Sequence, residues 1–214
     1  MADGPVIQAS SLRALKAGMK LDRVIDMAKA FRDRHPETPL ILMGYYNPIY
    51  IYGVDRFLAR AVEAGVDGMI MVDLPPEEDE EFCVPAMKTG IEMIRLVTPT
   101  TDTERMPLVL ERAGGFVYYV SITGITGTRS ASEDSIKSAM ERIRAVSDLP
   151  AVVGFGIRTP DQVREAARHA DGVVVGSAVV GAIAGSLDAD GKAGDNTIPA
   201  VLQQAYELAQ GRYR

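Results

Sequence analysis

Residues 151–176 read AVVGFGIRTPDQVREAARHADGVVVG, and this stretch decides the class of fold. It begins and ends with short apolar, β-branched runs that are typical of buried strands. Between them, Thr159 precedes Pro160 and Asp161, the order in which an N-cap residue and a first-turn proline open a helix. Parallel strands need a crossover connection, which is usually a helix. The stretch therefore predicts an α/β protein with a parallel sheet.

The same alternation extends along the rest of the chain. Strand-like runs are predicted at residues 39–45, 68–73, 91–97, 116–121, 151–155 and 172–176. Segments of helical period are predicted at residues 20–34, 55–64, 77–88, 103–112, 132–146, 160–168 and 199–210. This pattern favours a parallel sheet wrapped by helices. No stretch resembles a linker, so we expect a single domain over residues 1–214.

Composition and charge exclude several classes of protein. The chain has 214 residues, of which 47% are hydrophobic and 24% charged, as is usual for a globular protein. Its formal net charge of −6 argues against a nucleic-acid binder, which would show a basic face. No apolar run approaches the roughly 20 residues of a membrane span, so no membrane association is expected. The one cysteine, Cys83, cannot form an intrachain disulfide, and no signal peptide opens the chain, so we expect a cytoplasmic protein.

Glycines follow three of the predicted strands, at the ends where parallel α/β proteins bind ligands. They are Gly127 in the stretch 121–129, Gly156 after Gly154, and Gly176, which precedes Ser177 and a short helix. Backbone N–H groups at such turns and helix starts can bind an anion. We interpret the three strand ends together as a phosphate cradle. The alternative is that each glycine only relieves a tight turn.

Two aspartates and two tyrosines also follow predicted strands or precede helices. Asp73 closes the second run, where it either faces an active site or caps or anchors the helix that follows. Asp3 precedes a helix that begins near residue 6, unless it belongs to a frayed terminus. Tyr45 and Tyr46 follow the first run, where one could line a pocket for a flat apolar ligand while the other packs in the core. Asn47 could orient the loop expected there.

No metal site is predicted. His35 and His169 lie at predicted helix ends, and no cluster of cysteine and histidine supports metal binding. The acidic run from Glu77 to Glu81 opens a predicted helix, where negative charge suits the helix dipole. We interpret that run as a solvated first turn.

Short motifs occur in order along essentially the whole chain. They are ADGPVIQ at 2–8, LRALKAG at 12–18, MGYYNP at 43–48, VDLP at 72–75, GITG at 124–127, GFGI at 154–157 and GSA at 176–178. Together they resemble the tryptophan synthase α subunit family. The resemblance implies a TIM-type (β/α) barrel that cleaves indole-3-glycerol phosphate to indole and glyceraldehyde 3-phosphate by a retro-aldol step, with no cofactor of its own. It also implies a β-subunit partner in an α2β2 complex, whose own pyridoxal phosphate joins the indole to serine.

The resemblance further implies roles for individual residues. Asp3 would accept a hydrogen bond from the indole N–H, and Tyr118 would lie near the glycerol part of the substrate. The other matched residues are Gly127, Gly156, Gly176 and Ser177 for the phosphate, Met43, Tyr45, Ile70 and Phe155 for the indole pocket, and Asn47 facing the β subunit.

The family assigns the proton transfers to a glutamate on a strand that would precede Asp3. The chain starts at Met1, so we expect an incomplete barrel that lacks its first two strands, through a start codon assigned too late or a truncation. Such a barrel would expose open sheet edges at residues 39–45 and 172–176, unless they pair with each other or with another chain. A positioned acid/base group contributes roughly 10²- to 10⁴-fold, so we expect impaired catalysis.

Two alternatives stay open at this point. Without its glutamate the chain could be a non-catalytic partner of a β subunit. It could also be another barrel enzyme that binds a sugar phosphate, a substrate that needs no flat apolar pocket.

Overall fold

The computed structural model describes residues 3–121, 133–154 and 156–212. Its strands pair in parallel and in chain order: β1 (Ile41–Gly44), β2 (Gly68–Met71) and β3 (Glu92–Met93) form one group, and β4 (Arg95–Val97), β5 (Val117–Val120), β6 (Ala151–Gly154) and β7 (Gly172–Val174) form the other. Only Ile94 separates β3 from β4, and its N–H donates to the Met69 carbonyl oxygen of β2 at 3.0 Å. The predicted run 91–97 therefore contains both β3 and β4, and it connects the two groups of parallel strands.

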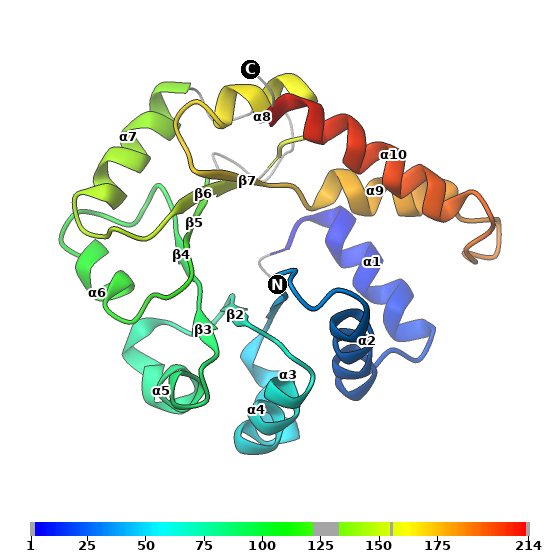
Figure 1. Cartoon of the computed structure of the whole chain (residues 1–214), viewed down its shortest axis with the longest axis horizontal. Coiled ribbons are helices and arrows are strands. Elements are labelled where there is room, and N and C mark those ends of the chain that lie inside the picture. Colours follow the sequence, from blue (N-terminus) through cyan, green and yellow to red (C-terminus); the bar gives the residue numbers. More distant parts are fainter. Residues whose placement is uncertain (1–2, 122–132, 155, 213–214) are drawn as a thin grey trace.

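Helices surround these strands (Figure 1). They are α1 (Pro5–Lys16), α2 (Leu21–Arg34), α3 (Tyr46–Tyr52), α4 (Val54–Glu63), the 3₁₀ helix η1 (Pro76–Glu81), α5 (Cys83–Lys88), α6 (Met106–Leu110), α7 (Glu133–Arg144), α8 (Pro160–Ala166), α9 (Ser177–Ser186), α10 (Thr197–Ala209) and the 3₁₀ helix η2 (Gln210–Arg212). Helix α8 begins as predicted, because the Thr159 hydroxyl accepts from the Gln162 N–H and the Gln162 amide oxygen accepts from the Thr159 N–H. The α/β prediction is confirmed.

Two local predictions were wrong. Residues 46–52 form helix α3, where a loop was expected. Residues 77–88 do not form one helix, because Phe82 adopts φ −141° and ψ −48° and separates η1 from α5. In both places a short element depends on contacts with distant parts of the chain, and local sequence does not encode those contacts.

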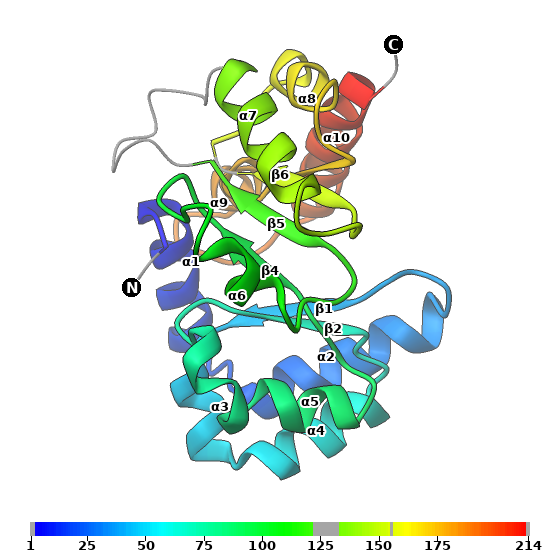
Figure 2. The ribbon, with the colours of Figure 1, turned by 90° about the vertical axis from the view of Figure 1, so that its left-hand side faces the viewer.

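The strands divide the apolar side chains between an outer and an inner layer. Along β5, Val117 and Tyr119 pack outward against the helices, whereas Tyr118 points inward and meets Ile70 and Ile94. This alternation is the two-residue period of a strand. Figure 2 shows the helices on both sides of the strands, with α7, α8 and α10 above them and α3, α4 and α5 below. The outer layer is the larger core, and the inner layer lies where a barrel has its interior.

The barrel is open, as the sequence predicts. Within the described residues, β1 pairs only with β2 and β7 only with β6. Helix α1 contacts α9 beside the gap between these two edges (Figure 1). No helix in the described ranges is both long and apolar enough to cross a membrane.

Candidate functional site

Asp3 and Tyr45 lie together where β1 ends. The Tyr45 hydroxyl donates to Asp3 Oδ2 at 2.7 Å, and the Asp3 N–H donates to the Tyr45 hydroxyl oxygen at 3.3 Å. The Gln8 side-chain amide also donates to the Asp3 carbonyl oxygen at 2.7 Å. Asp3 is therefore held in place rather than frayed. Because a carboxylate has two oxygens, Oδ1 can accept a hydrogen bond from a ligand N–H group.

Asp73 anchors a helix, but not the one expected. Its Oδ1 accepts the backbone N–H of Tyr46, the first residue of α3, at 2.8 Å. Helix α3 precedes Asp73 in the chain, whereas the expected anchor was for the helix that follows. Asp73 reaches the start of α3 because the carboxyl ends of β1 and β2 are adjacent, with Gly44 and Met71 as register partners.

The two adjacent tyrosines have different surroundings. Tyr46 packs against the outer core, and its hydroxyl donates to Glu81 Oε2 at 2.7 Å. Burial and the Glu81 carboxylate raise the pKa of Tyr46 to about 12. Tyr45 instead directs its hydroxyl to the Asp3 carboxylate. Asn47 is exposed in the first turn of α3, where a partner can reach it.

Three of the predicted ligand-binding side chains share the inner face of the sheet. Ile70 and Tyr118 are buried in the same apolar cluster. Met43 is the register partner of Ile70, so both point to the same side, and Met43 is 54% exposed because β1 is an edge strand. Burial raises the pKa of the Tyr118 phenol, so its hydroxyl stays protonated and can donate a hydrogen bond.

The predicted phosphate residues gather at the neighbouring ends of β6 and β7. Gly154 is the register partner of Val174, which brings these two strand ends together. Gly156 has a φ of +76°, a backbone conformation that favours glycine. Gly176 is the N-cap of α9 and Ser177 its first residue, so the first N–H groups of that helix, which have no partner within the helix itself, lie at this strand end. Gly127 and Phe155 lie outside the described residues.

Gly154 also shapes the inner face, which gives a prediction. A Cβ at residue 154 would lie 2.7 Å from the Tyr118 hydroxyl oxygen and 2.9 Å from Val174 Cβ. We expect Gly154→Ala to displace Tyr118 and to lower the free energy of unfolding by about 1–3 kcal/mol, measured by urea titration. Gly181→Ala is the control, because nothing lies within 4 Å of its Cβ position. A Gly154→Ala protein as stable as the wild type would contradict this packing.

The acidic run at residues 77–81 is not simply a solvated turn, and that interpretation was wrong for Asp79. Asp79 is 3% exposed and accepts both from Arg95, which is 6% exposed, and from Arg112 Nη1 at 3.4 Å. Arg95 Nη2 also donates to Cys83 Sγ at 3.2 Å. Sequence reasoning missed this cluster. The sequence does contain one indication of this cluster. Arg95 lies within an apolar strand, and a charged side chain there needs a buried partner of opposite charge.

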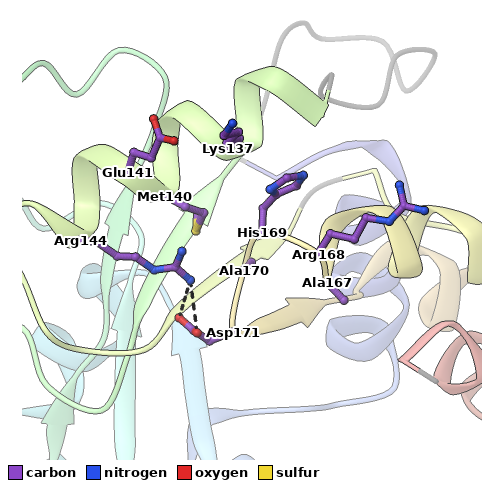
Figure 3. A pocket seen from close by; sticks show the side chains of 9 residues that line it. All are labelled: Lys137, Met140, Glu141, Arg144, Ala167, Arg168, His169, Ala170 and Asp171. Atoms are coloured by element: carbon purple, nitrogen blue, oxygen red, sulfur yellow. Dashed lines mark hydrogen bonds and ion pairs between the residues drawn. The ribbon is translucent and has the colours of Figure 1, made fainter. Parts of the chain in front are cut away.

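A cavity of about 370 Å³ lies apart from these strand ends, between α7 and the turn after α8 (Figure 3). Several of its charged side chains form ion pairs, one of them within the lining and others with Glu133 next to it. Arg144 Nη2 is 3.3 and 3.4 Å from the carboxylate oxygens of Asp171, and His169 Nε2 is 2.9 Å from Glu133 Oε1. The Ala151 N–H donates to Asp171, and this bond together with Arg144 holds the pKa of Asp171 below its usual value. Asp171 and Ala151 mark the amino ends of β7 and β6, opposite to the predicted ligand site.

Known proteins resemble the chain in both sequence and structure. The family described as Tryptophan synthase alpha chain matches residues 1–209. Tryptophan synthase subunit alpha from Legionella pneumophila str. Paris is 39% identical with a TM-score of 0.84, over 99% of this chain and 76% of that chain. A structure of the tryptophan synthase α2β2 complex from the hyperthermophile Pyrococcus furiosus is 37% identical with a TM-score of 0.81, over 98% of this chain and 80% of that chain.

A structure of tryptophan synthase from M. tuberculosis in its aminoacrylate-bound form is 30% identical with a TM-score of 0.83, over 99% of this chain and 76% of that chain. The likeness thus covers nearly all of this chain, in sequence and in three dimensions, and about three quarters of each solved relative. The open parallel β/α barrel and the match over residues 1–209 show that the chain belongs to the tryptophan synthase alpha chain family.

Proposed function

We propose that the carboxyl ends of the strands form the substrate site of an α-type lyase in tryptophan biosynthesis. In this reaction indole-3-glycerol phosphate is cleaved to indole and glyceraldehyde 3-phosphate. The observation that carries the proposal is the Asp3 carboxylate held by the Tyr45 hydroxyl where β1 ends. A fixed carboxylate beside an apolar inner face suits an indole ring, which has one N–H group on a flat apolar body.

At the indole end, Asp3 accepts the ring N–H and stabilises the cation that forms. Cleavage of the carbon–carbon bond requires a proton on the indole ring carbon, which places positive charge on the ring nitrogen. A carboxylate already oriented toward that nitrogen lowers the energy of this charge without reorganising during the reaction. Met43, Ile70 and Tyr45 would contact the ring.

At the other end, the glycerol phosphate would lie toward β5, β6 and β7. Tyr118 stays protonated at neutral pH and can donate to a glycerol oxygen. The N–H groups at the start of α9, with Gly156, Gly176 and Ser177, would bind the phosphate oxygens. These two ends of the inner face together select a ligand that is apolar at one end and anionic at the other.

The proton transfers need an acid and a base. One group protonates the ring carbon, and another removes the glycerol hydroxyl proton as that carbon becomes an aldehyde. The family resemblance assigns this work to a glutamate on a strand before Asp3, ahead of Met1 in this numbering. Binding is therefore tested with the 214-residue chain, and the contribution of such a glutamate is tested with a chain extended before Met1.

Isothermal titration with an indole analogue that carries a phosphonate tail tests the proposal on the chain as it is. We expect saturable binding that weakens when either the ring or the phosphonate is removed. An Asp3→Asn variant should bind the analogue less tightly and inorganic phosphate equally well. Equal affinity for the analogue and for a simple sugar phosphate would instead favour the sugar-phosphate enzyme and overturn the proposal.

We also propose that the chain binds a tryptophan synthase β subunit through a surface that includes Asn47, and that it does so in the cytoplasm. Asn47 is exposed at the start of α3, and the Pyrococcus furiosus relative is part of an α2β2 complex. We expect co-purification with a β subunit and loss of the complex in Asn47→Arg, but not in Lys137→Glu on α7. Binding to the β subunit together with no affinity for the indole analogue would support the non-catalytic partner.

A further inference from the structure

We propose that Asp73 is a positioning residue: by accepting the Tyr46 N–H it fixes the start of α3, and so holds the Tyr45 hydroxyl on Asp3. This inference rests on the proposed function, since it concerns how the site keeps Asp3 ready for the indole N–H. It adds a residue to which the family resemblance gives no role.

The contacts form a short chain from Asp73 to Asp3. Asp73 Oδ1 is 2.8 Å from Tyr46 N, and the preceding residue, Tyr45, donates its hydroxyl to Asp3 Oδ2 at 2.7 Å. The two contacts are made by residues that are adjacent in the chain. A shift of the backbone at residue 46 therefore moves Tyr45 and its hydroxyl directly.

Helix α3 needs this external support because it cannot fix its own start. It has seven residues, and its N-cap residue, Tyr45, makes no side-chain capping bond. Helices this short are marginal in isolation. Asp73, by contrast, follows a firmly paired strand, since the Val72 N–H donates to the Gly44 carbonyl oxygen at 3.0 Å and continues the β1–β2 pairing up to its neighbour.

The carboxylate of Glu81 binds the side-chain end of Tyr46, and this second contact supplies a matched control. The Tyr46 hydroxyl donates to Glu81 Oε2 at 2.7 Å. Tyr46→Phe removes this contact and leaves the backbone N–H on Asp73 intact. If local stability alone mattered, Tyr46→Phe and Asp73→Ala would act alike; if the backbone anchor matters, only Asp73→Ala would disturb Asp3.

The alternative role for Asp73 is direct contact with substrate, because its carboxylate is exposed at a strand end. The two roles separate in Asp73→Asn. The asparagine side chain keeps a carbonyl oxygen that can accept the Tyr46 N–H, but it loses the negative charge. A positioning role is therefore rescued by asparagine, whereas a role that needs the charge is not.

The test measures binding by calorimetry. The four proteins are the wild type, Asp73→Ala, Asp73→Asn and Tyr46→Phe. Each is titrated with the indole phosphonate analogue, with its N1-methyl derivative and with inorganic phosphate. The N1-methyl ring cannot donate to Asp3. We expect Asp73→Ala to weaken binding of the analogue about tenfold, as for the loss of one well-placed hydrogen bond to a charged group. Its affinities for the N1-methyl derivative and for phosphate should stay at the wild-type values, and Asp73→Asn and Tyr46→Phe should match the wild type with all three probes.

Tyr45→Phe keeps the test decisive if Asp73→Ala folds poorly. It removes the hydroxyl contact itself and should reproduce the tenfold loss, and Asp73→Ala in that background should add nothing. Equal losses for the analogue and its N1-methyl derivative, or a loss in Asp73→Asn as large as in Asp73→Ala, would overturn the inference. A wild-type protein that does not distinguish the analogue from its N1-methyl derivative would instead overturn the proposed role of Asp3, and the inference with it.

Discussion

Replacing Asp79 with alanine is expected to lower the free energy of unfolding by about 3–5 kcal/mol, because the change leaves the Arg95 charge buried without its main partner. Both side chains, Asp79 on η1 and Arg95 on β4, are more than nine-tenths buried. Arg95 Nε already lacks a hydrogen-bond partner within the described structure. Urea unfolding monitored by circular dichroism measures the loss.

Two further variants show whether the loss comes from the unpaired charge. Removing both charges, with Asp79→Leu and Arg95→Met, should recover much of the lost stability, since apolar residues can replace a buried ion pair at little cost. Glu80→Ala, at an exposed position of the same run, should change the free energy of unfolding by less than about 0.5 kcal/mol. An Asp79→Ala protein that loses less than about 1 kcal/mol would mean that water reaches Arg95.

Replacing Asp3 with asparagine should lower kcat/KM for indole-3-glycerol phosphate by about 10²- to 10³-fold, in a chain extended before Met1 by the strands that carry the family's glutamate. Asparagine can still accept the indole N–H, but it has no charge to stabilise the cation at the ring nitrogen. A smaller part of the loss should appear as weaker binding, because the indole N–H then donates to a neutral acceptor. The larger part should fall on kcat, because the positive charge develops only as the ring carbon is protonated.

Asp26→Asn is the matched control for this substitution. Asp26 is an exposed aspartate on α2 that pairs with Arg60, remote from the strand ends. It should leave both kinetic constants unchanged. Steady-state release of indole measures both variants, and an Asp3→Asn enzyme with wild-type kcat would remove Asp3 from the chemistry.

Much of the fold follows from local pattern in the sequence. Runs of β-branched residues mark the strands, and Thr159-Pro160 marks the start of α8, because strand burial and helix capping depend on neighbours in the chain. The unpaired edges of β1 and β7 within the described residues agree with the incomplete barrel that the sequence predicts.

The rest depends on contacts between distant residues. Helix α3 forms where Asp73 and Glu81 hold Tyr46, and both partners are more than twenty residues away in sequence. The Asp79 carboxylate can be buried because it forms an ion pair with Arg95 on β4. Periodicity does not reveal such pairs, and acidic residues in a first helical turn are usually exposed, so Asp79 was expected to be solvated. The Asp3–Tyr45 contact likewise joins two residues that sequence reasoning named separately.

The assignment of an α-type lyase is tested by the release of indole from indole-3-glycerol phosphate, measured side by side for the 214-residue chain and for the chain extended before Met1. We expect the extended chain to form indole and glyceraldehyde 3-phosphate in equal amounts. Its rate should exceed that of the 214-residue chain by about 10²- to 10⁴-fold, the contribution of a positioned acid/base group. An extended chain that folds, binds the substrate and releases no indole would show that these strand ends do not form the active site of such a lyase.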